Sequence, residues 1–301
     1  MKMENARMIK LKGIITSDWH LRSQLPRCRK DENWIETQKN AIEQIYKYAK
    51  KYNCNVFIVG DIFHSHSETT VEVIQIVQNL AKKLKKLGLK LYLLAGNHDL
   101  LYHSSENIEK SAVGILLKSD NIFPISSYSE DVSAGNFDEE TENKEIIFKH
   151  VLVFPDVKSL PPNVDAITAK ELLSEYSNAE WIFTGDMHKN FHYEKNGRHV
   201  VNPGCLIREV SDMKDYKNGC YFVDTESEIV ERLEIKDDEE FVDDSYILKE
   251  KEKTDRIEKF ANKLKETKDI SLDFISNVES AVKQNKLSAE LVDTIEELLE
   301  V

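Results

Sequence analysis

Five short polar clusters, each at the end of an apolar run, constrain the fold of this 301-residue chain more than any other feature. The apolar runs begin near Ile14, Val56, Leu91, Glu145 and Trp181. The clusters that follow them are Asp18-Trp19-His20, Gly60-Asp61, Gly96-Asn97-His98-Asp99, His150, and Gly185-Asp186-Met187-His188. Runs of four or five apolar residues are typical of buried strands, and strand ends that meet at one edge of an open sheet form ligand sites. The sequence therefore predicts an α/β protein whose polar clusters gather at one edge.

Two amphipathic segments separate the first three apolar runs. Residues 34–51 and 69–87 repeat apolar side chains at helical spacing, so we expect both to be crossover helices. The order strand, helix, strand, helix, strand implies parallel pairing with right-handed crossovers. Residues 126–143 are rich in Ser, Asp and Glu and predict a surface loop before the fourth strand. The β-rich runs 199–201 and 219–223 predict additions to a second sheet.

A change of composition near residue 230 predicts two parts. Residues 1–230 would form the body, and residues 231–301 an acidic linker with a small C-terminal helical appendage. The second part carries 12 Lys and Arg against 21 Asp and Glu, so it holds −9 of the net charge of −13 and leaves −4 for the body. An acidic chain argues against a nucleic-acid partner, because phosphate binding usually requires a basic surface. Most of the negative charge therefore lies outside the body, which weakens that objection.

Other sequence features indicate the compartment. An apolar stretch long enough to span a bilayer is lacking, so we expect no membrane contact. The four cysteines have no C-x-x-C spacing, which argues against a zinc ribbon or a disulfide framework. We expect a cytoplasmic protein, in the host cytoplasm if the chain is phage-encoded. The oligomeric state stays open, a homodimer included.

The five clusters, in this order, resemble the motifs D-x-H, G-D, G-N-H-D, H and G-H-x-H of the calcineurin-like metallophosphoesterases. The resemblance spans residues 14–208 and implies a two-sheet sandwich flanked by helices that hydrolyses phosphoesters with two metal ions. Within that superfamily the chain looks most like SbcD-type DNA repair nucleases and their phage-encoded relatives. This closer resemblance rests on residues 22–31, 184–189 and 201–208.

The resemblance also implies which side chains hold the two divalent ions. Seven residues would supply the ligands: Asp18, His20 and His188 for the first ion, Asn97, His150 and Asp186 for the second, and Asp61 as the bridge. Most members of the family have a histidine where this chain has Asp186. A carboxylate is a harder ligand than an imidazole, so the second site favours manganese, with magnesium or iron as alternatives, over zinc.

His98 is the predicted catalytic acid. Its place between Asn97 and Asp99 in the resembling motif assigns it stabilisation of the transition state and proton donation to the leaving oxygen. Asp99 would assist as the carboxylate that fixes the tautomer of His98. The alternatives are that His98 is only a turn residue and Asp99 only a helix cap.

Six further residues are predicted to contact substrate: Arg22, Arg27, Arg29, His64, His103 and Arg208. The first three follow the first cluster closely and could guide a phosphate backbone into the site. An exposed loop paired with Asp31 and Glu32 would explain them equally well. Arg208 follows a turn that resembles a family element returning to the metals. The two histidines follow the second and third clusters, where solvated loop histidines are equally consistent.

The leading hypothesis is a metal-dependent phosphodiesterase that hydrolyses DNA, as an exonuclease or endonuclease of repair or recombination. DNA as the substrate depends on the resemblance alone. One alternative is a phosphatase or phosphodiesterase that acts on small nucleotides or phosphoproteins, which the acidic charge favours modestly. Another is a nuclease subunit that acts through an SbcC-type ATPase bound to the C-terminal helices. The apolar faces of those helices would equally suit packing on the body.

Overall fold

The computed structural model describes residues 10–67, 69–136, 139–161, 164, 166–210, 213–237, 242 and 256. The chain divides into two compact units, Met1–Asp243 and Asp244–Val301. All helices and strands described below belong to the first unit. The predicted C-terminal helices lie outside the described residues, apart from the single residue Arg256.

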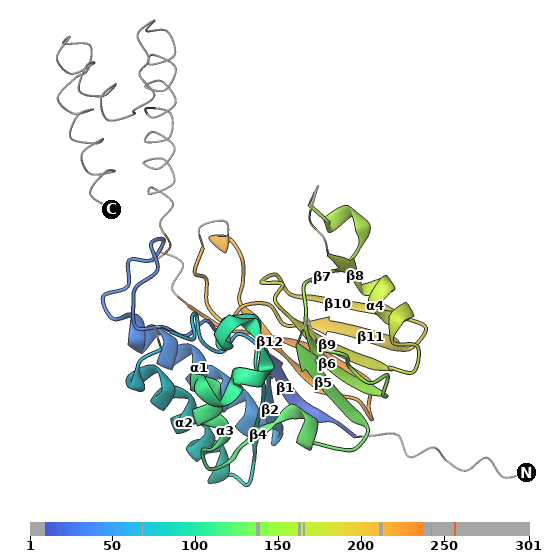
Figure 1. Cartoon of the computed structure of the whole chain (residues 1–301), viewed down its shortest axis with the longest axis horizontal. Helices are drawn as coiled ribbons and strands as arrows, with labels where there is room; N and C mark the ends of the chain where they lie inside the picture. The colour runs from blue at the N-terminus through green and yellow to red at the C-terminus, as the bar shows by residue number, and fades with distance from the viewer. Residues whose placement is uncertain are drawn as a thin grey trace, which may run out of the picture. The chain divides into compact units, whose positions relative to one another are not determined.

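The first layer of the body is a six-stranded sheet in the order β13-β12-β1-β2-β3-β4. Its strands are β1 (Lys12–Thr16), β2 (Asn55–Val59), β3 (Leu91–Leu94), β4 (Ile122–Pro124), β12 (Gly219–Asp224) and β13 (Ile229–Glu234). The strands β1 to β4 pair in parallel, which confirms the pairing predicted for the first three apolar runs. The helices α1 (Trp34–Tyr52) and α2 (Val71–Lys85) connect them, and α3 (Ala112–Leu117) precedes β4. Figure 1 shows these three helices together on one side of the sheet.

Helix α1 shows how local sequence fixes this layer. The side chain of Asn33 accepts the backbone N–H of Glu36 at 3.1 Å and so caps the first turn. The helix ends at Asn53, which adopts left-handed backbone with φ 48°. Ile42 and Ile45 lie on its buried face, within the core that the helices share with the sheet. The helix is therefore fixed at both ends and along one side.

The second layer is a five-stranded sheet in the order β10-β11-β9-β6-β5. Its strands are β5 (Val132–Asn136), β6 (Ile146–His150), β9 (Trp181–Gly185), β10 (Phe191–Lys195) and β11 (Arg198–Asn202). Aromatic rings fill the space between the two sheets: the centroid of Phe57 lies 5.5 Å from that of Phe148, which lies 4.8 Å from that of Phe183. This core confirms the predicted two-sheet sandwich flanked by helices.

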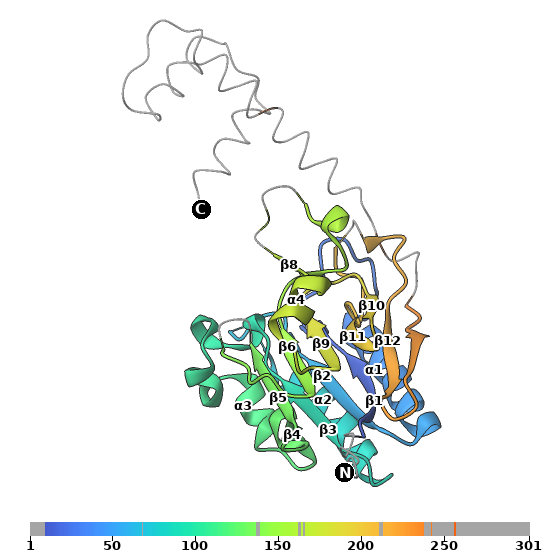
Figure 2. The same ribbon diagram turned by 90° about the vertical axis from the view of Figure 1, so that its right-hand side faces the viewer.

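The outer face of the second sheet packs against helix α4 (Ala169–Glu175). Ile147 and Ile182, which alternate with the inward-facing phenylalanines, contact its buried side chains. Figure 2 shows α4 beside β6 and β9, near β8 (Ile167–Thr168), which pairs with β7 (Val153–Phe154) in a small sheet. Strands buried on both faces explain why these segments are continuous apolar runs.

Three sequence predictions about the layers were wrong. Residues 219–223 belong to β12, which extends the first sheet through antiparallel pairing with β1, because a β-rich run does not encode its partner. The predicted loop at 126–143 contains β5, an edge strand that pairs with β6 on one side only and so needs few apolar side chains. The predicted domain end at residue 230 falls inside β13, so the first sheet continues past it.

Among the described residues, none of the helices combines the length and the apolar character that a membrane crossing needs.

Candidate metal centre

Five strand ends bring the polar clusters together. Asp18, Asp61 and Asn97 follow the carboxyl ends of the neighbouring strands β1, β2 and β3, while His150 ends β6 and Asp186 follows β9. Direct hydrogen bonds join the ends of the two sheets. His150 Nδ1 lies 2.9 Å from the carbonyl oxygen of Val59, and the backbone N–H of Asp186 donates to Asp18 Oδ1 at 3.0 Å. The centre therefore spans both sheets.

Strained backbone occurs at four of the predicted metal ligands. Asp18, His20, Asp61 and Asp186 have φ angles of 49°, 45°, 49° and 75°, in the left-handed region that residues with a Cβ rarely adopt. Hydrogen bonds hold these turns in place: the N–H groups of Trp19 and His20 both donate to the carbonyl oxygen of Asp61, at 2.8 and 3.0 Å. Such strain persists only where the surroundings enforce it, and it occurs preferentially at functional sites.

Asp61 lies at the middle of the cluster. Its Oδ2 is 3.3 Å from His150 Nε2 and 3.7 Å from His20 Nε2, and its Oδ1 accepts the backbone N–H of His98 at 3.0 Å. One carboxylate oxygen thus faces a histidine from each predicted metal site, which is the position that a bridging ligand requires. Burial opposes its charge, but the neighbouring His150 holds the pKa of Asp61 below its ordinary value.

The ligand atoms form two overlapping groups. Asp18, His20 and His188 offer atoms within 4.8 Å of one another, and so do Asp18, Asp61 and His150. Asp18 belongs to both groups, whereas the sequence placed it on the first ion alone. Two more predicted ligands adjoin the second group: Asn97 Oδ1 is 3.0 Å from His150 Nε2, and Asp186 lines a pocket of about 570 Å³ with Asn97 and His150. The structure therefore brings all seven predicted ligands together.

The chemistry of these side chains fits divalent cations. The Nε2 atoms of His20 and His188 face each other at 3.2 Å, as two ligands of one ion would. Burial lowers the pKa of His20 well below its ordinary value, which favours the neutral ring that a metal binds. Burial raises the pKa of Asp18 to about 6, and the negative charge of Asp61 acts in the same direction. A cation bound between these two carboxylates would stabilise their charged forms.

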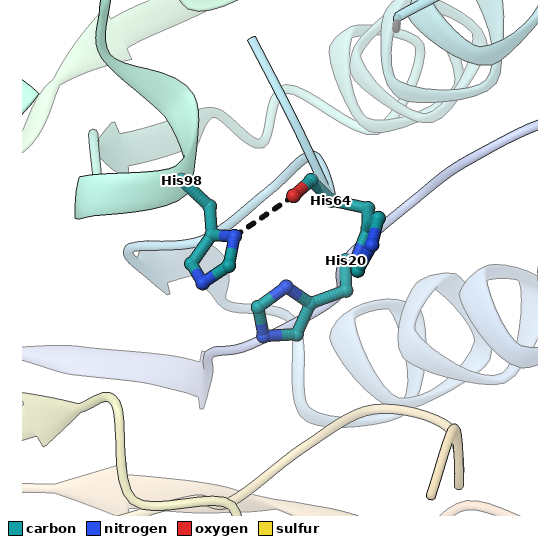
Figure 3. A group of neighbouring side chains, drawn as sticks. All are labelled: His20, His64 and His98. Carbon is teal, nitrogen blue, oxygen red and sulfur yellow. Dashed lines mark hydrogen bonds between the residues drawn. The ribbon is translucent and has the colours of Figure 1, made fainter. Parts of the chain in front are cut away.

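The partner of His98 is not the predicted carboxylate. His98 Nδ1 lies 2.8 Å from the backbone carbonyl oxygen of His64, which makes Nδ1 the N–H donor (Figure 3). Asp99 is buried and accepts the backbone N–H groups of Gly96, Ile62 and Phe63 at 2.8, 3.1 and 2.8 Å. The prediction that Asp99 orients His98 was therefore wrong. The two residues share a 3₁₀ turn, where consecutive side chains point in different directions, and Asp99 instead ties that turn to the one after β2.

Two of the predicted substrate contacts were also wrong. Arg29 and Arg208 are buried, and both form ion pairs with Asp237, at 2.9 and 2.7 Å. Arg29 additionally forms a bidentate ion pair with Asp31, with N···O distances of 2.7 and 2.8 Å. A guanidinium that is fully paired inside the fold cannot reach a phosphate backbone. Arg29 and Arg208 join the segments after β1 and β11 to the chain that leaves β13.

This buried ion-pair cluster supports a stability prediction. We expect Asp237→Ala to lower the free energy of unfolding by about 3 to 5 kcal/mol, because two buried guanidiniums would lose a partner. Asp120→Ala is the matched control, since Asp120 pairs with Lys85 on the surface and should change stability little. Urea unfolding of both variants measures the difference. Equal stabilities of the two variants would contradict the structural role of the cluster.

The remaining predicted contacts lie closer to the metal ligands, except Arg27, which is exposed on its loop. Arg22 Nη2 is 3.0 Å from Glu209 Oε2, and His103 Nδ1 is 2.8 Å from the carbonyl oxygen of Asn97. Arg22 and His64 line a pocket of about 130 Å³ together with His20, His98 and His188. Glu209 could not be predicted from the sequence, because a single glutamate after Arg208 belongs to no motif.

The family model of calcineurin-like phosphoesterases matches residues 11–204 of this chain. Exonuclease subunit 1 of Enterobacteria phage T4 is 31% identical over 94 residues, which are 31% of this chain and 26% of that protein, so the match spans about a quarter of that relative. A solved archaeal phosphodiesterase is 15% identical with a TM-score of 0.42, covering 74% of this chain and 99% of its own. The nuclease MPE of Pseudomonas putida is 14% identical with a TM-score of 0.34, covering 73% and 87%.

Proposed function

Because the chain belongs to the calcineurin-like phosphoesterases, a family of metal-dependent hydrolases with a dinuclear centre, we propose that it hydrolyses phosphodiester bonds in DNA as a nuclease. The observation that carries this proposal is that a pocket adjoins each of the two groups of candidate ligands. The larger pocket lies at Asn97, His150 and Asp186, and the smaller one at His20, His98 and His188. A phosphodiester has a substituent on both sides of its phosphorus, whereas a monoester has one. The phage relative is named an exonuclease subunit, which adds support for a nucleic-acid substrate.

The side chains have separate tasks in this proposal. Asp18, His20 and His188 would hold the first ion, Asn97, His150 and Asp186 the second, and Asp61 both. When bound, the ions supply positive charge to the phosphate oxygens and activate the attacking water. His98 donates the proton that the leaving oxygen needs. The His64 carbonyl holds the Nδ1–H of His98, so Nε2 is the atom that delivers this proton.

An assay against four substrate classes tests the proposal. The purified protein with manganese should hydrolyse single- or double-stranded DNA faster than 2′,3′-cyclic nucleotides or a phenyl phosphate monoester. Faster hydrolysis of the monoester would favour the alternative of a phosphatase acting on small nucleotides or phosphoproteins. A separate proposal is that the chain works as a subunit with a partner ATPase, supported by the word subunit in the name of the phage relative.

We propose manganese as the native metal, with magnesium or iron as alternatives, because Asp186 puts a hard oxygen beside His150. Asp186→His should shift the preference of the second site toward zinc, since imidazole is the softer ligand. Asp186→Ala should lose affinity at that site. Titration calorimetry with Mn²⁺ and Zn²⁺ on the three proteins measures both effects. Unchanged binding in both variants would mean that Asp186 only shapes its turn.

A further inference from the structure

Three histidines from different turns converge beside the dinuclear centre. Figure 3 shows the rings of His20, His64 and His98 turned toward one another. Each ring offers a nitrogen, and these nitrogens lie within 4.8 Å of one another. The ring centroid of His20 is 4.9 Å from that of His98 and 5.9 Å from that of His64. The three rings form a group of imidazoles without a carboxylate among them.

The two nitrogens of the His20 ring have different surroundings. Nε2 faces the dinuclear centre, 3.2 Å from His188 Nε2 and 3.7 Å from Asp61 Oδ2. Nδ1 is buried and has no hydrogen-bond partner within the described part of the chain. Figure 3 shows it on the side of the ring that faces His98 and His64. A buried polar atom without a partner is unfavourable, and a cation on this side would satisfy it.

His98 has the outer hydrogen bond that metal-binding histidines usually have, and His64 has a carboxylate nearby, beyond hydrogen-bond distance. His98 Nδ1 donates to the His64 carbonyl oxygen at 2.8 Å, which leaves the lone pair of Nε2 for an ion. His64 Nδ1 is 4.0 Å from Glu209 Oε2, and Arg22 holds that carboxylate at 3.0 Å. The carbonyl partner of His98 fixes the tautomer of its ring and raises its basicity as a ligand.

We propose that His20, His64 and His98 form a third metal site, which binds zinc and inhibits the enzyme. Three imidazoles with an open fourth position suit zinc better than manganese or magnesium. The adjoining pocket of about 130 Å³ leaves room for a water as the fourth ligand. Nitrogens around tetrahedral zinc are about 3.4 Å apart, so the rings must close in. The side chain of His64 is 36% exposed and that of His20 is 7% exposed, so His64 is the less confined ring and would move the more.

Zinc at this site would inhibit through two of its ligands. It would occupy His98 Nε2, the atom that the proposed mechanism uses to protonate the leaving oxygen. It would also share the His20 ring with the first ion, and a ring bound at both nitrogens must release its N–H proton to solvent. Zinc binding at this site and turnover of a phosphoester whose leaving oxygen needs a proton therefore exclude each other.

The number of ions per chain tests the site without any substrate. The parent protein saturated with Zn²⁺ should hold three ions by metal analysis, and His64→Ala should hold two. His66→Ala, which removes a histidine from the same loop outside the cluster, should hold three. With Co²⁺, the third equivalent should give the intense visible absorption of a four-coordinate site in the parent and not in His64→Ala. Two ions in the parent, or three in His64→Ala, would overturn the proposal.

Inhibition distinguishes the third site from simple displacement of manganese. Zinc inhibition is best measured on a 2′,3′-cyclic nucleotide, a diester whose alkoxide leaving group needs a proton. At saturating Mn²⁺, half-inhibition of His64→Ala should require a zinc concentration at least about 10-fold above that for the parent, each relative to its own uninhibited rate. His66→Ala should resemble the parent. Equal sensitivity of His64→Ala and the parent would mean that zinc acts at the dinuclear centre. Because this diester contains no DNA, the result does not depend on the proposed substrate.

Discussion

Asp61→Asn is expected to weaken metal binding at both sites by more than about 100-fold. Loss of a residue that only hydrogen-bonds to a metal ligand already lowers metal affinity by up to about 100-fold, and Asp61 would itself contact both ions. Asp61 Oδ2 faces His150 and His20 at 3.3 and 3.7 Å, and Oδ1 accepts the N–H of His98. An asparagine that keeps the bond to His98 must turn its NH₂ group toward the two imidazoles. The variant therefore loses the bridging charge and places a donor where two cations should be.

Titration calorimetry with Mn²⁺ and metal analysis of the dialysed protein measure this loss. Asp156→Asn is a suitable control, because Asp156 only caps a surface turn through Ser159 and should leave both ions bound. Retention of both ions at the parental affinity in Asp61→Asn would show that Asp61 does not bridge.

His98→Ala is expected to keep both metal ions and to lower kcat on DNA by about two to four orders of magnitude, the range for a positioned proton donor. The metals should stay because the contact to Asp61 comes from the backbone N–H of His98, which alanine retains. A p-nitrophenolate leaving group needs no proton, so the loss on bis(p-nitrophenyl) phosphate should be much smaller.

Single-turnover rates on both substrates separate the two effects, with His66→Ala as the histidine control. An equal loss on DNA and on the nitrophenyl diester would point to a different role for His98, such as holding the phosphate. Loss of metal in His98→Ala would instead place its ring in the dinuclear centre.

The sequence predicted the parts of the fold that depend on local pattern. Ile58 and Phe148 lie in runs that are apolar throughout because both faces of their strands are buried, and such runs are recognisable without a structure. The partner of a strand is not a local property, which is why 219–223 was assigned to the wrong sheet. Likewise, nothing in Ser133 or Gly135 distinguishes an edge strand from a loop.

In the candidate site, too, features that depend on local pattern could be predicted and features that depend on distant partners could not. Its candidate ligands could be named from the sequence because each stands at or just after a strand end, within a motif that resembles the family's. The roles of charged residues outside the motifs could not be predicted, because their partners are distant in the chain. Arg29 and Arg208 pair with Asp237, and Arg22 pairs with Glu209. Asp99 belongs to a motif, yet its three backbone partners depend on how two turns meet in space.

Anomalous diffraction from crystals grown with Mn²⁺ tests the central claim, a dinuclear centre bridged by Asp61, most directly. We expect two peaks about 3.5 to 4 Å apart. One should lie among Asp18, His20 and His188, and the other among Asn97, His150 and Asp186, with Asp61 between them. A single peak, or two peaks that Asp61 does not join, would contradict the account.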